Sequence, residues 1–385
     1  MEGCIEQDKF YSISVMSKTF LSRAVKSELW FKAHGRCEMC NKPLYRDGLT
    51  MMGVNLSEYA HIIADSVNGP RGDEILSSEY CDKESNLILL CKDHHKLIDS
   101  AEGAKKYDVA LLKKIKQEHE ARIELVTGIS PEKKSMVVCY APIIGDRTPS
   151  ITDSITMETL FPDMFPMELK PIRLNATDIP FNDNQQKYWE VQPDILKENF
   201  RKKLAEKIAD IPHISLFALA PQPLLVLLGT LIGDLYHVDI MQKHRDPDTW
   251  RWLDENVDNE FRTYYPENKG LNPVLIIALS GCDIIERVKQ QLGDGFSYWV
   301  ITCENPYRDM MRTRHQLSDF GTLLKKVLCE INANSVGKML QVFPAMPVSC
   351  AIKMGQVRLP KADLPWVLYD LPKESEVFVK TITIE

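Results

Sequence analysis

The chain has 385 residues, enough for about two or three domains, and its formal net charge of −7 excludes proteins that bind nucleic acid through bulk positive charge alone. Its 44% hydrophobic and 26% charged residues are ordinary globular values, which excludes wholesale disorder. The first twenty residues mix charged and polar side chains without an apolar run, so no cleavable signal peptide is expected. In that context the ten cysteines indicate a reduced, cytoplasmic protein.

Four residues in the N-terminal part have the spacing of zinc ligands. Cys37 and Cys40 form a CxxC pair, and Cys91 and His94 repeat this spacing about fifty residues later. Thiolate and imidazole suit Zn²⁺ and not Mg²⁺, and two short-spaced pairs are typical of a closed structural site. A redox CxxC would explain only the first pair. The sequence therefore predicts a structural zinc ion, with two other cysteines left outside the site: Cys4 and Cys81.

Two short strands and a helix are predicted between and after the zinc pairs. The strands cover residues 58–63 and 86–90, and the helix begins at His95 and continues through Asp99. Together with the CxxC pair, the GPRGD stretch at 69–73 and the order His, Asn, His, these elements resemble the HNH, or ββα-metal, nucleases. The resemblance covers about residues 30–100.

The resemblance implies catalytic roles for His61, Asn86 and His95. Imidazole exchanges a proton near neutral pH, so His61 is expected to act as the general base that activates water. Asn86 is expected to fix the loop that holds His61 through hydrogen bonds to the backbone. His95 would offer its imidazole to a catalytic Mg²⁺, Mn²⁺ or Ni²⁺ ion.

The second protein ligand of the catalytic metal is an open question in this sequence. Many members of the family carry Asp or His immediately before the base, but here that position is Ala60. Asp99 lies four residues after His95, on the same helix face, and is the favoured ligand, with Asp65 as the reserve. The alternative is a catalytically inactive fold retained as a zinc-containing DNA-binding module.

An amphipathic helix over residues 107–126 and a polar segment at 127–135 are predicted to close this domain. The expected organisation is a nuclease domain at 1–130, a linker at 131–150 and a second domain at 151–385. Residues 211–233 contain no Asp, Glu, Lys or Arg and are long enough to span a bilayer. Because Pro221 and Pro223 interrupt this segment, a strand, a turn and a buried helix are expected there, and no membrane contact.

The second domain contains a weak internal repeat. Residues 217–221 (FALAP) are followed by Gly229, and residues 343–347 (FPAMP) are followed at the same spacing by Gly355. Each copy follows an apolar strand and precedes an apolar helix and a further strand, at 235–241 or 366–371, and more strands lie between the copies, at 273–281 and 298–302. This alternation predicts a parallel α/β fold built from a pseudo-twofold pair of units, and a chance similarity within one sheet is the alternative.

This repeat resembles the two CARF-like, Rossmann-type halves of a SAVED domain. The complete fold prediction is therefore an α+β zinc-stapled HNH domain joined to an α/β SAVED domain. The combination resembles an effector nuclease of bacterial CBASS antiphage signalling. The resemblance implies that a cyclic di- or trinucleotide binds SAVED, that the chain then forms homo-oligomers (dimer to tetramer), and that double-stranded DNA is cleaved with little sequence specificity.

The cyclic nucleotide is expected at the edge of the sheet where the parallel strands end. The turns at Pro221 and Pro347 open helices whose free N–H groups attract phosphate. The candidate ligand-binding residues are Pro221, Gln222, Ser280, Tyr307, Arg308, Pro347 and Ser349, with Arg312, Trp250, Trp252 and Trp366 as further groups able to stack on bases or bind phosphate.

Two other functions fit the same motifs. One is a restriction endonuclease whose second domain senses modified DNA. The other is a non-catalytic, zinc-stapled DNA-binding regulator. The effect of a cyclic nucleotide on cleavage separates the three.

Overall fold

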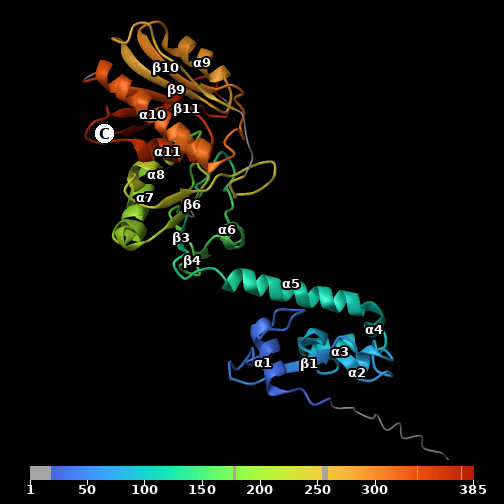
Figure 1. The fold of residues 1–385 in the computed structure, drawn as a ribbon. Helices are drawn as coiled ribbons and strands as arrows, with labels where there is room; N and C mark the ends of the chain where they lie inside the picture. The colour runs from blue at the N-terminus through green and yellow to red at the C-terminus, as the bar shows by residue number, and fades with distance from the viewer. Residues whose placement is uncertain (1–18, 177–178, 254–258, 336, 374) are drawn as a thin grey trace, which may run out of the picture. The chain divides into compact units, whose positions relative to one another are not determined.

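The computed structural model describes residues 19–176, 179–253, 259–335, 337–373 and 375–385 (Figure 1). The chain divides into two compact units that meet between Ile129 and Ser130. This boundary lies inside the polar segment 127–135. Cys4, one of the two cysteines not assigned to the zinc site, lies outside the described residues.

The first unit is built around an antiparallel pair of strands followed by a helix. Strand β1 pairs with β2 so that His61 lies opposite Leu87, and α3 begins directly after β2. The helix therefore starts three residues before His95, earlier than predicted, and Asp99 is its C-terminal cap. The elements are α1 Arg23–Lys32, β1 Ser57–His61, α2 Leu76–Tyr80, η1 Glu84–Asn86, β2 Leu87–Cys91, α3 Lys92–Ile98, α4 Gly103–Lys106 and α5 Val109–Thr127.

Helix α5 belongs to this first unit. Asp108 caps its N-terminus by accepting a hydrogen bond from the Leu111 N–H. The buried ammonium of Lys116 contacts Glu84 of η1 at 2.5 Å and Glu120 at 2.7 Å, and Leu112 joins the hydrophobic core. The amphipathic helix predicted over 107–126 is thus confirmed, and its buried face packs on the ββα elements.

The second unit begins with a parallel sheet in the order β4-β3-β6-β7, with β5 also pairing to β3. Residues 131–150, expected to form a linker, instead contain β3, whose side chains from Ser135 to Tyr140 are buried. The apolar stretch Met136–Ala141 is the physical reason, because it fills the middle of this sheet. The elements are β3 Lys134–Tyr140, α6 Asp153–Leu160, β4 Phe165–Pro166, β5 Ile172–Arg173, α7 Gln186–Phe200, η2 Arg201–Ala205, η3 Ile208–Asp210, β6 Ile214–Ala218, α8 Gln222–Ile232 and β7 Val238–Ile240.

The unit continues with a second sheet in the order β13-β12-β11-β9-β10-β8. Its inner four strands are parallel and its two edge strands are antiparallel to their neighbours. The elements are β8 Phe261–Tyr264, β9 Asn272–Ala278, α9 Asp283–Leu292, β10 Phe296–Cys303, α10 Arg314–Asn334, β11 Leu340–Ala345, α11 Val348–Val357, β12 Trp366–Asp370 and β13 Val379–Ile384.

One continuous hydrophobic core joins the two sheets. Alternate residues of β3 and β6 in one sheet, and of β9, β10 and β11 in the other, pack on α7, α8, α10 and α11 within this core. The outer faces are covered separately, by α6 on the first sheet and by α9 on the second. The second unit is thus a pair of α/β halves packed through their inner helices.

The predicted repeat corresponds to the contact between these halves. Helices α8 and α11, which lie side by side in Figure 1, follow Pro221 and Pro347 and carry Gly229 and Gly355 at equivalent positions. A Cβ atom on Gly229 would lie 2.0 Å from the Ile352 carbonyl oxygen, and one on Gly355 would lie 2.0 Å from that of Val226. The repeated glycines therefore let the two helix backbones touch, each fitting against the other helix.

The apolar segment 211–233 forms β6, a proline turn and the buried helix α8, as predicted. Among the described residues, no helix combines the length and the hydrophobicity that crossing a bilayer requires.

Replacing Gly229 by Ala is expected to destabilise the second unit. The added methyl group would overlap backbone of α11, which side-chain rotation cannot relieve, so a loss of about 1–3 kcal/mol or more is expected. Thermal unfolding of the full chain measures this as a lower midpoint. Gly295→Ala is the matched control, because its Cβ has open space. Equal midpoints for both variants would contradict the close helix contact.

Candidate functional site

The four predicted zinc ligands lie together in the first unit. The Sγ atoms of Cys37, Cys40 and Cys91 and one ring nitrogen of His94 all lie within 4.8 Å of one another. The Nδ1 atom of His94 is 3.5 Å from the Cys37 sulfur and 3.2 Å from the Cys91 sulfur. Tetrahedral zinc holds sulfur and nitrogen ligands about 3.5 Å apart, so the cluster fits a Cys₃His zinc site.

The local backbone explains how these ligands converge. Gly35 has a φ of +62°, and a Cβ there would lie 2.7 Å from the Trp30 ring, so glycine is required at the start of the turn. The Glu38 N–H donates to the Leu89 carbonyl oxygen at 2.9 Å, which attaches the CxxC turn to β2. Cys91 ends β2 and His94 lies in the first turn of α3, so the metal ties the turn to both elements of the ββα unit.

The chemistry of the thiols also fits a bound cation. Burial raises the pKa of the Cys37 thiol to about 12, so this group would stay protonated without a nearby positive charge. A zinc ion supplies that charge and displaces the proton. Cys81 lies outside the cluster and donates its S–H to the Ser78 carbonyl oxygen.

His61 is held by a backbone hydrogen bond at the end of β1. Its Nε2 lies 2.8 Å from the Cys81 carbonyl oxygen. A carbonyl only accepts, so Nε2 carries the proton, and the Nδ1 of the neutral ring keeps its lone pair. His61 is half-buried, so part of the residue is accessible to solvent. This arrangement suits a group that removes a proton from water.

Asn86 fixes the backbone that follows His61. Its Oδ1 accepts from the Ile63 N–H and its Nδ2 donates to the Ile63 carbonyl oxygen, both at 2.8 Å. The Nδ2 group also donates to the Tyr80 carbonyl oxygen at 3.2 Å. The side chain is buried, so these bonds satisfy an amide that would otherwise be costly to bury. They are the backbone bonds expected from the sequence.

Arg71 joins both sides of this site and was not predicted. Its guanidinium donates to the carbonyl oxygens of Ile62 at 2.8 Å, Ile98 at 2.6 Å and His61 at 3.3 Å. It also contacts the Asp99 carboxylate at 2.8 Å, and its side chain is only 4% exposed. Arg71 lies in the GPRGD stretch at 69–73, which contributed to the family resemblance but did not single out Arg71 as a site residue.

His95 and Asp99 meet on one face of α3, as their spacing predicts. The His95 Nε2 lies 3.2 Å from Asp99 Oδ2, and the His95 Nδ1 lies 3.7 Å from Glu58 Oε2. The hydrogen bond to Asp99 raises the pKa of His95 against the opposing effect of burial. Burial opposes ionisation of Asp99, but hydrogen bonds from His95 and Arg71 outweigh it and lower the pKa of that carboxyl. Asp65, the reserve ligand, accepts a hydrogen bond from the Thr19 hydroxyl at 2.8 Å.

Two family models match the chain. Residues 37–102 match the HNH endonuclease family, and residues 196–384 match SAVED, described as the SMODS-associated and fused to various effectors sensor domain. The chain is an HNH–SAVED protein. The SAVED match begins inside α7, yet β3 pairs with β6 in the same sheet, so the folded SAVED domain also includes the residues from Ser130 onward. No curated protein matches the chain.

Solved structures of Cap4 SAVED/CARF-domain containing receptors also match. The receptor of Acinetobacter baumannii with the cyclic trinucleotide 2'3'3'-cAAA is 12% identical over 81% of this chain and 62% of that chain, with a TM-score of 0.40. The same receptor with 3'3'3'-cAAA is 10% identical over 74% and 56%, with a TM-score of 0.41. The Moraxella osloensis receptor is 10% identical over 73% and 60%, with a TM-score of 0.38. This chain therefore spans less than two thirds of the length of these receptors.

The two halves of the SAVED domain meet where their strands end. Gln222, the first residue of α8, accepts a hydrogen bond from the Met346 N–H at 3.1 Å, just before Pro347. The Ser280 N–H donates to the Ala345 carbonyl oxygen at 2.9 Å. The structure thus brings the turns at Pro221 and Pro347 and the Ser280 turn together, as expected for one site.

Other predicted nucleotide-binding groups are less accessible. Ser349 is fully buried, and its hydroxyl donates to Gln242 Oε1 at 2.7 Å. Pro221 and Pro347 are buried as well, so a ligand would contact neighbouring residues of their turns and not the two prolines themselves. Tyr307 and Arg308 are exposed in the loop after β10, where side chains can reach a ligand.

The tryptophans suggested as stacking groups are corrected by the structure. Trp366 is fully buried in the core shared by the halves, and Trp250 is 4% exposed and packs on Phe217. Trp252 is partly buried and donates to the Ile240 carbonyl oxygen at 3.1 Å. Large apolar rings reduce their exposed area by entering the core, which here outweighs ligand contact.

Arg312, a candidate phosphate-binding group, belongs to a polar network whose other members the sequence did not indicate. His244 Nδ1 lies 3.1 Å from Asp309 Oδ1, and Arg312 contacts Asp309 Oδ2 at 2.9 Å. Gln242 and His244 follow β7 of the first half, while Asp309 and Arg312 follow β10 of the second half. The network therefore fixes two loops at the strand ends. No sequence spacing links these residues, because the halves are far apart in the chain.

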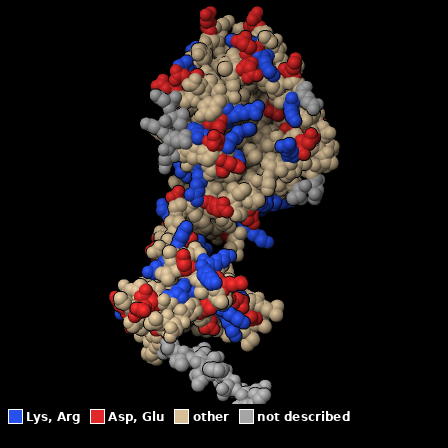
Figure 2. All heavy atoms as spheres, turned by 90° about the vertical axis from the view of Figure 1, so that its right-hand side faces the viewer, with Lys and Arg blue, Asp and Glu red and all other residues tan. Residues whose placement is uncertain are grey.

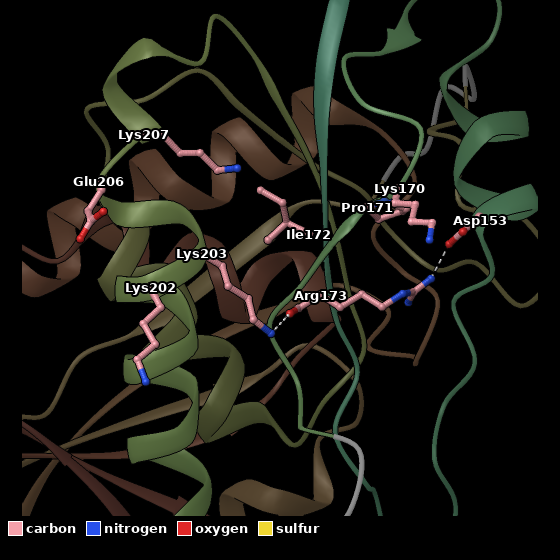
Figure 3. A pocket seen from close by; sticks show the side chains of 9 residues that line it. All are labelled: Asp153, Lys170, Pro171, Ile172, Arg173, Lys202, Lys203, Glu206 and Lys207. Carbon is pink, nitrogen blue, oxygen red and sulfur yellow. Dashed lines mark hydrogen bonds and ion pairs between the residues drawn. The ribbon is translucent and has the colours of Figure 1, made fainter.

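A basic hollow of about 620 Å³ lies elsewhere on the SAVED domain, beside β5 and η2 (Figure 3). Arg173 contacts Asp153 at 2.6 Å, and the Lys203 ammonium donates to the Arg173 carbonyl oxygen at 2.8 Å. Paired charges of this kind hold an anion weakly. The hollow is lined by Asp153, Lys170, Pro171, Ile172, Arg173, Lys202, Lys203, Glu206 and Lys207, none of them a predicted nucleotide-binding residue.

Cys37→Ser is expected to remove the zinc ion and unfold the HNH domain, because a hydroxyl is a poor substitute for thiolate and the small domain depends on the metal. Metal analysis should find one tightly held zinc ion per wild-type chain and none in the variant, with loss of soluble protein. Cys81→Ser is the matched control and should keep its zinc, since Cys81 lies outside the cluster. A zinc-free but well-folded wild-type protein would overturn the assignment.

Arg71→Lys is expected to loosen the site, since an ammonium cannot reproduce four contacts of a buried guanidinium. Loss of charge-assisted hydrogen bonds predicts a decrease of about 2 kcal/mol or more in local stability. Hydrogen exchange in β1 and α3 should accelerate, whereas Arg23→Lys, at an exposed position, should leave it unchanged. Unaltered exchange in Arg71→Lys would show that Arg71 has no positioning role.

Proposed function

We propose that this chain is a metal-dependent endonuclease activated by a cyclic oligonucleotide, acting in the cytoplasm of bacteria as an antiphage effector of the CBASS type. The observation that supports this proposal is the presence, in one chain, of an HNH domain with an ordered histidine site and a SAVED sensor domain. The proposed substrate is double-stranded DNA, cut with little sequence specificity.

Hydrolysis of a phosphodiester requires an activated water molecule and a positive charge near the developing anion. In the proposed mechanism, the Nδ1 of His61 takes the proton from water, because its Nε2 is committed to the Cys81 carbonyl oxygen. Asn86 keeps the backbone after His61 in place through Ile63. A Mg²⁺, Mn²⁺ or Ni²⁺ ion at His95 would supply the positive charge.

Charge explains why activation by assembly fits this protein. Residues 1–140 contain 20 lysines and arginines against 21 aspartates and glutamates. On the face shown in Figure 2, basic and acidic side chains are interspersed. Such a surface attracts the DNA backbone weakly. Several copies joined by their SAVED domains would bind one DNA molecule through many weak contacts and bring two active sites to two strands. We therefore propose a dimer to tetramer as the active form.

The proposed ligand is a cyclic di- or trinucleotide bound where the strands of the two SAVED halves end. The turn residues Gln222 and Ser280 lie at this edge, and Arg308, exposed in the loop after β10, is proposed to meet phosphate. Pro221, Pro347, Ser349 and Tyr307 remain predicted members of the site. Buried Ser349 would act by holding its turn through Gln242.

Plasmid degradation by the purified full chain tests the proposal. Cyclic di- and trinucleotides are added one at a time with Mg²⁺, Mn²⁺ or Ni²⁺, and light scattering follows particle size. We expect cleavage only with one of these ligands, accompanied by growth in particle size. His61→Ala should retain zinc and lose at least about 100-fold in the cleavage rate, the usual contribution of a general base.

His315→Ala is the matched control, since His315 is exposed in α10 of the SAVED domain. It should cleave at the wild-type rate. Cleavage that follows base modification and ignores all the ligands would indicate a modification-sensing restriction enzyme. DNA binding without any cleavage would indicate a zinc-stapled regulator. Wild-type cleavage by His61→Ala would show that His61 is not the base.

A further inference from the structure

Ala60 stands where many members of the family carry a metal-binding Asp or His, and Glu58 lies on the same side of β1. Successive side chains of a strand point to opposite faces, so Glu58 and Ala60 share a face. Ala60 is fully buried, whereas the Glu58 side chain is 45% exposed and reaches toward α3. Its Oε2 lies 3.7 Å from the Nδ1 of His95. The Glu58 side chain, two residues before position 60 and longer than that of an aspartate, thus brings a carboxylate to His95.

His95 has a carboxylate at each edge of its ring. The Nε2 atom lies at hydrogen-bond distance, 3.2 Å, from Asp99 Oδ2, whereas the 3.7 Å between Nδ1 and Glu58 Oε2 is too long for a hydrogen bond. An imidazole that binds a cation through one ring nitrogen keeps its N–H on the other, and the shorter contact places that N–H on Nε2, toward Asp99. The lone pair of Nδ1 then faces the carboxylate of Glu58 across a gap.

A cation fits that gap. Without a metal, a proton on Nδ1 would face Glu58, and a cation bound at this position replaces that proton and lies between the two ligand atoms. Neighbouring ligands of an octahedral ion with bonds of about 2.1 Å are about 3 Å apart. The half-exposed Glu58 side chain therefore has to move by less than an ångström from its present 3.7 Å to complete such a pair.

Asp99 is already engaged on both of its oxygens. Arg71 Nη2 contacts Oδ1 at 2.8 Å, and His95 Nε2 lies 3.2 Å from Oδ2. A carboxylate that accepts the outer N–H of a metal-binding histidine fixes the ring and makes the other nitrogen a better ligand. Asp99 is placed for that task, and Arg71 holds Asp99.

We propose that Glu58 Oε and His95 Nδ1 are the protein ligands of the catalytic cation, and that Asp99 orients His95 from the opposite edge of its ring. This assignment rests on the proposed metal-dependent nuclease function and replaces Asp99 as the expected second ligand. One carboxylate and one imidazole suit Mg²⁺, Mn²⁺, Co²⁺ or Ni²⁺ and leave several positions for water and a phosphate oxygen.

Cobalt absorption identifies the ligand directly. The full-length protein, with its Cys₃His site filled with zinc, is titrated with Co²⁺ as wild type and as Glu58→Cys, Asp99→Cys and Glu79→Cys. A thiolate bound to Co²⁺ gives a charge-transfer band in the near ultraviolet that carboxylate does not give. We expect a new band in Glu58→Cys alone. Zinc content of one ion per chain shows that each variant is folded.

Binding affinity gives a second readout. Glu58→Gln should weaken Co²⁺ binding at least about tenfold, because an amide oxygen carries no charge. Glu79→Gln is the matched control, since Glu79 is exposed on α2 and should leave the affinity unchanged. Restoring Co²⁺ binding to Glu58→Gln by adding Ala60→Asp would show that both positions face the same ion.

The outcomes separate this inference from the proposed function. A band in Asp99→Cys and none in Glu58→Cys would make Asp99 the ligand and overturn the assignment. Wild-type Co²⁺ binding with no band in any variant would also overturn it, while metal-dependent cleavage stands. A wild-type protein that binds no cobalt would identify Glu58, His95 and Asp99 as an ion-pair cluster and overturn both the assignment and the metal requirement.

Discussion

The Cys37, Cys40, Cys91 and His94 cluster is the constraint on which the catalytic part of the molecule depends. Strands β1 and β2 have five residues each, too few to be stable as an isolated pair in water. A metal at the end of β2 and the start of α3 fixes where that helix begins. The positions of His95 and Asp99 follow from that start, because they lie on successive turns of the same helix.

The interior of the site is then fixed by backbone hydrogen bonds from long polar side chains. Asn86 binds the residue two positions after His61, and Arg71 binds carbonyl groups of both β1 and α3. These two side chains hold β1 and the residues after it, which contribute no ligand to the zinc cluster. The site therefore has two layers of support, a metal at one end and a buried amide and guanidinium at the other. Such support would reduce the reorganisation that the proposed catalysis requires.

The sequence allowed the zinc ligands, the ββα order and the repeated glycines to be predicted, since each depends on short spacing or on a repeated pattern. Arg71, Gln242 and the His244–Asp309 pair were missed because their partners lie far away in the chain. Glu58 was not predicted because the family pattern points to the residue immediately before His61, although alternation along the strand places Glu58 on the same face as position 60. The expected linker at 131–150 overlaps β3 because the apolar residues of this strand directly follow a polar, proline-containing stretch.

The contact between α8 and α11 restricts how a ligand can act on the SAVED domain. Backbone atoms of the two helices meet through Gly229 and Gly355, and the halves share one hydrophobic core. Sliding the halves past each other would drive Cα atoms into carbonyl groups, which a close-packed interior resists. Gln222 and Gln242 add hydrogen bonds across the same junction. The proposed ligand at the strand ends would therefore meet a preformed surface, and this rigidity supports the proposed activation by joining separate copies of the chain over a hinge within one copy.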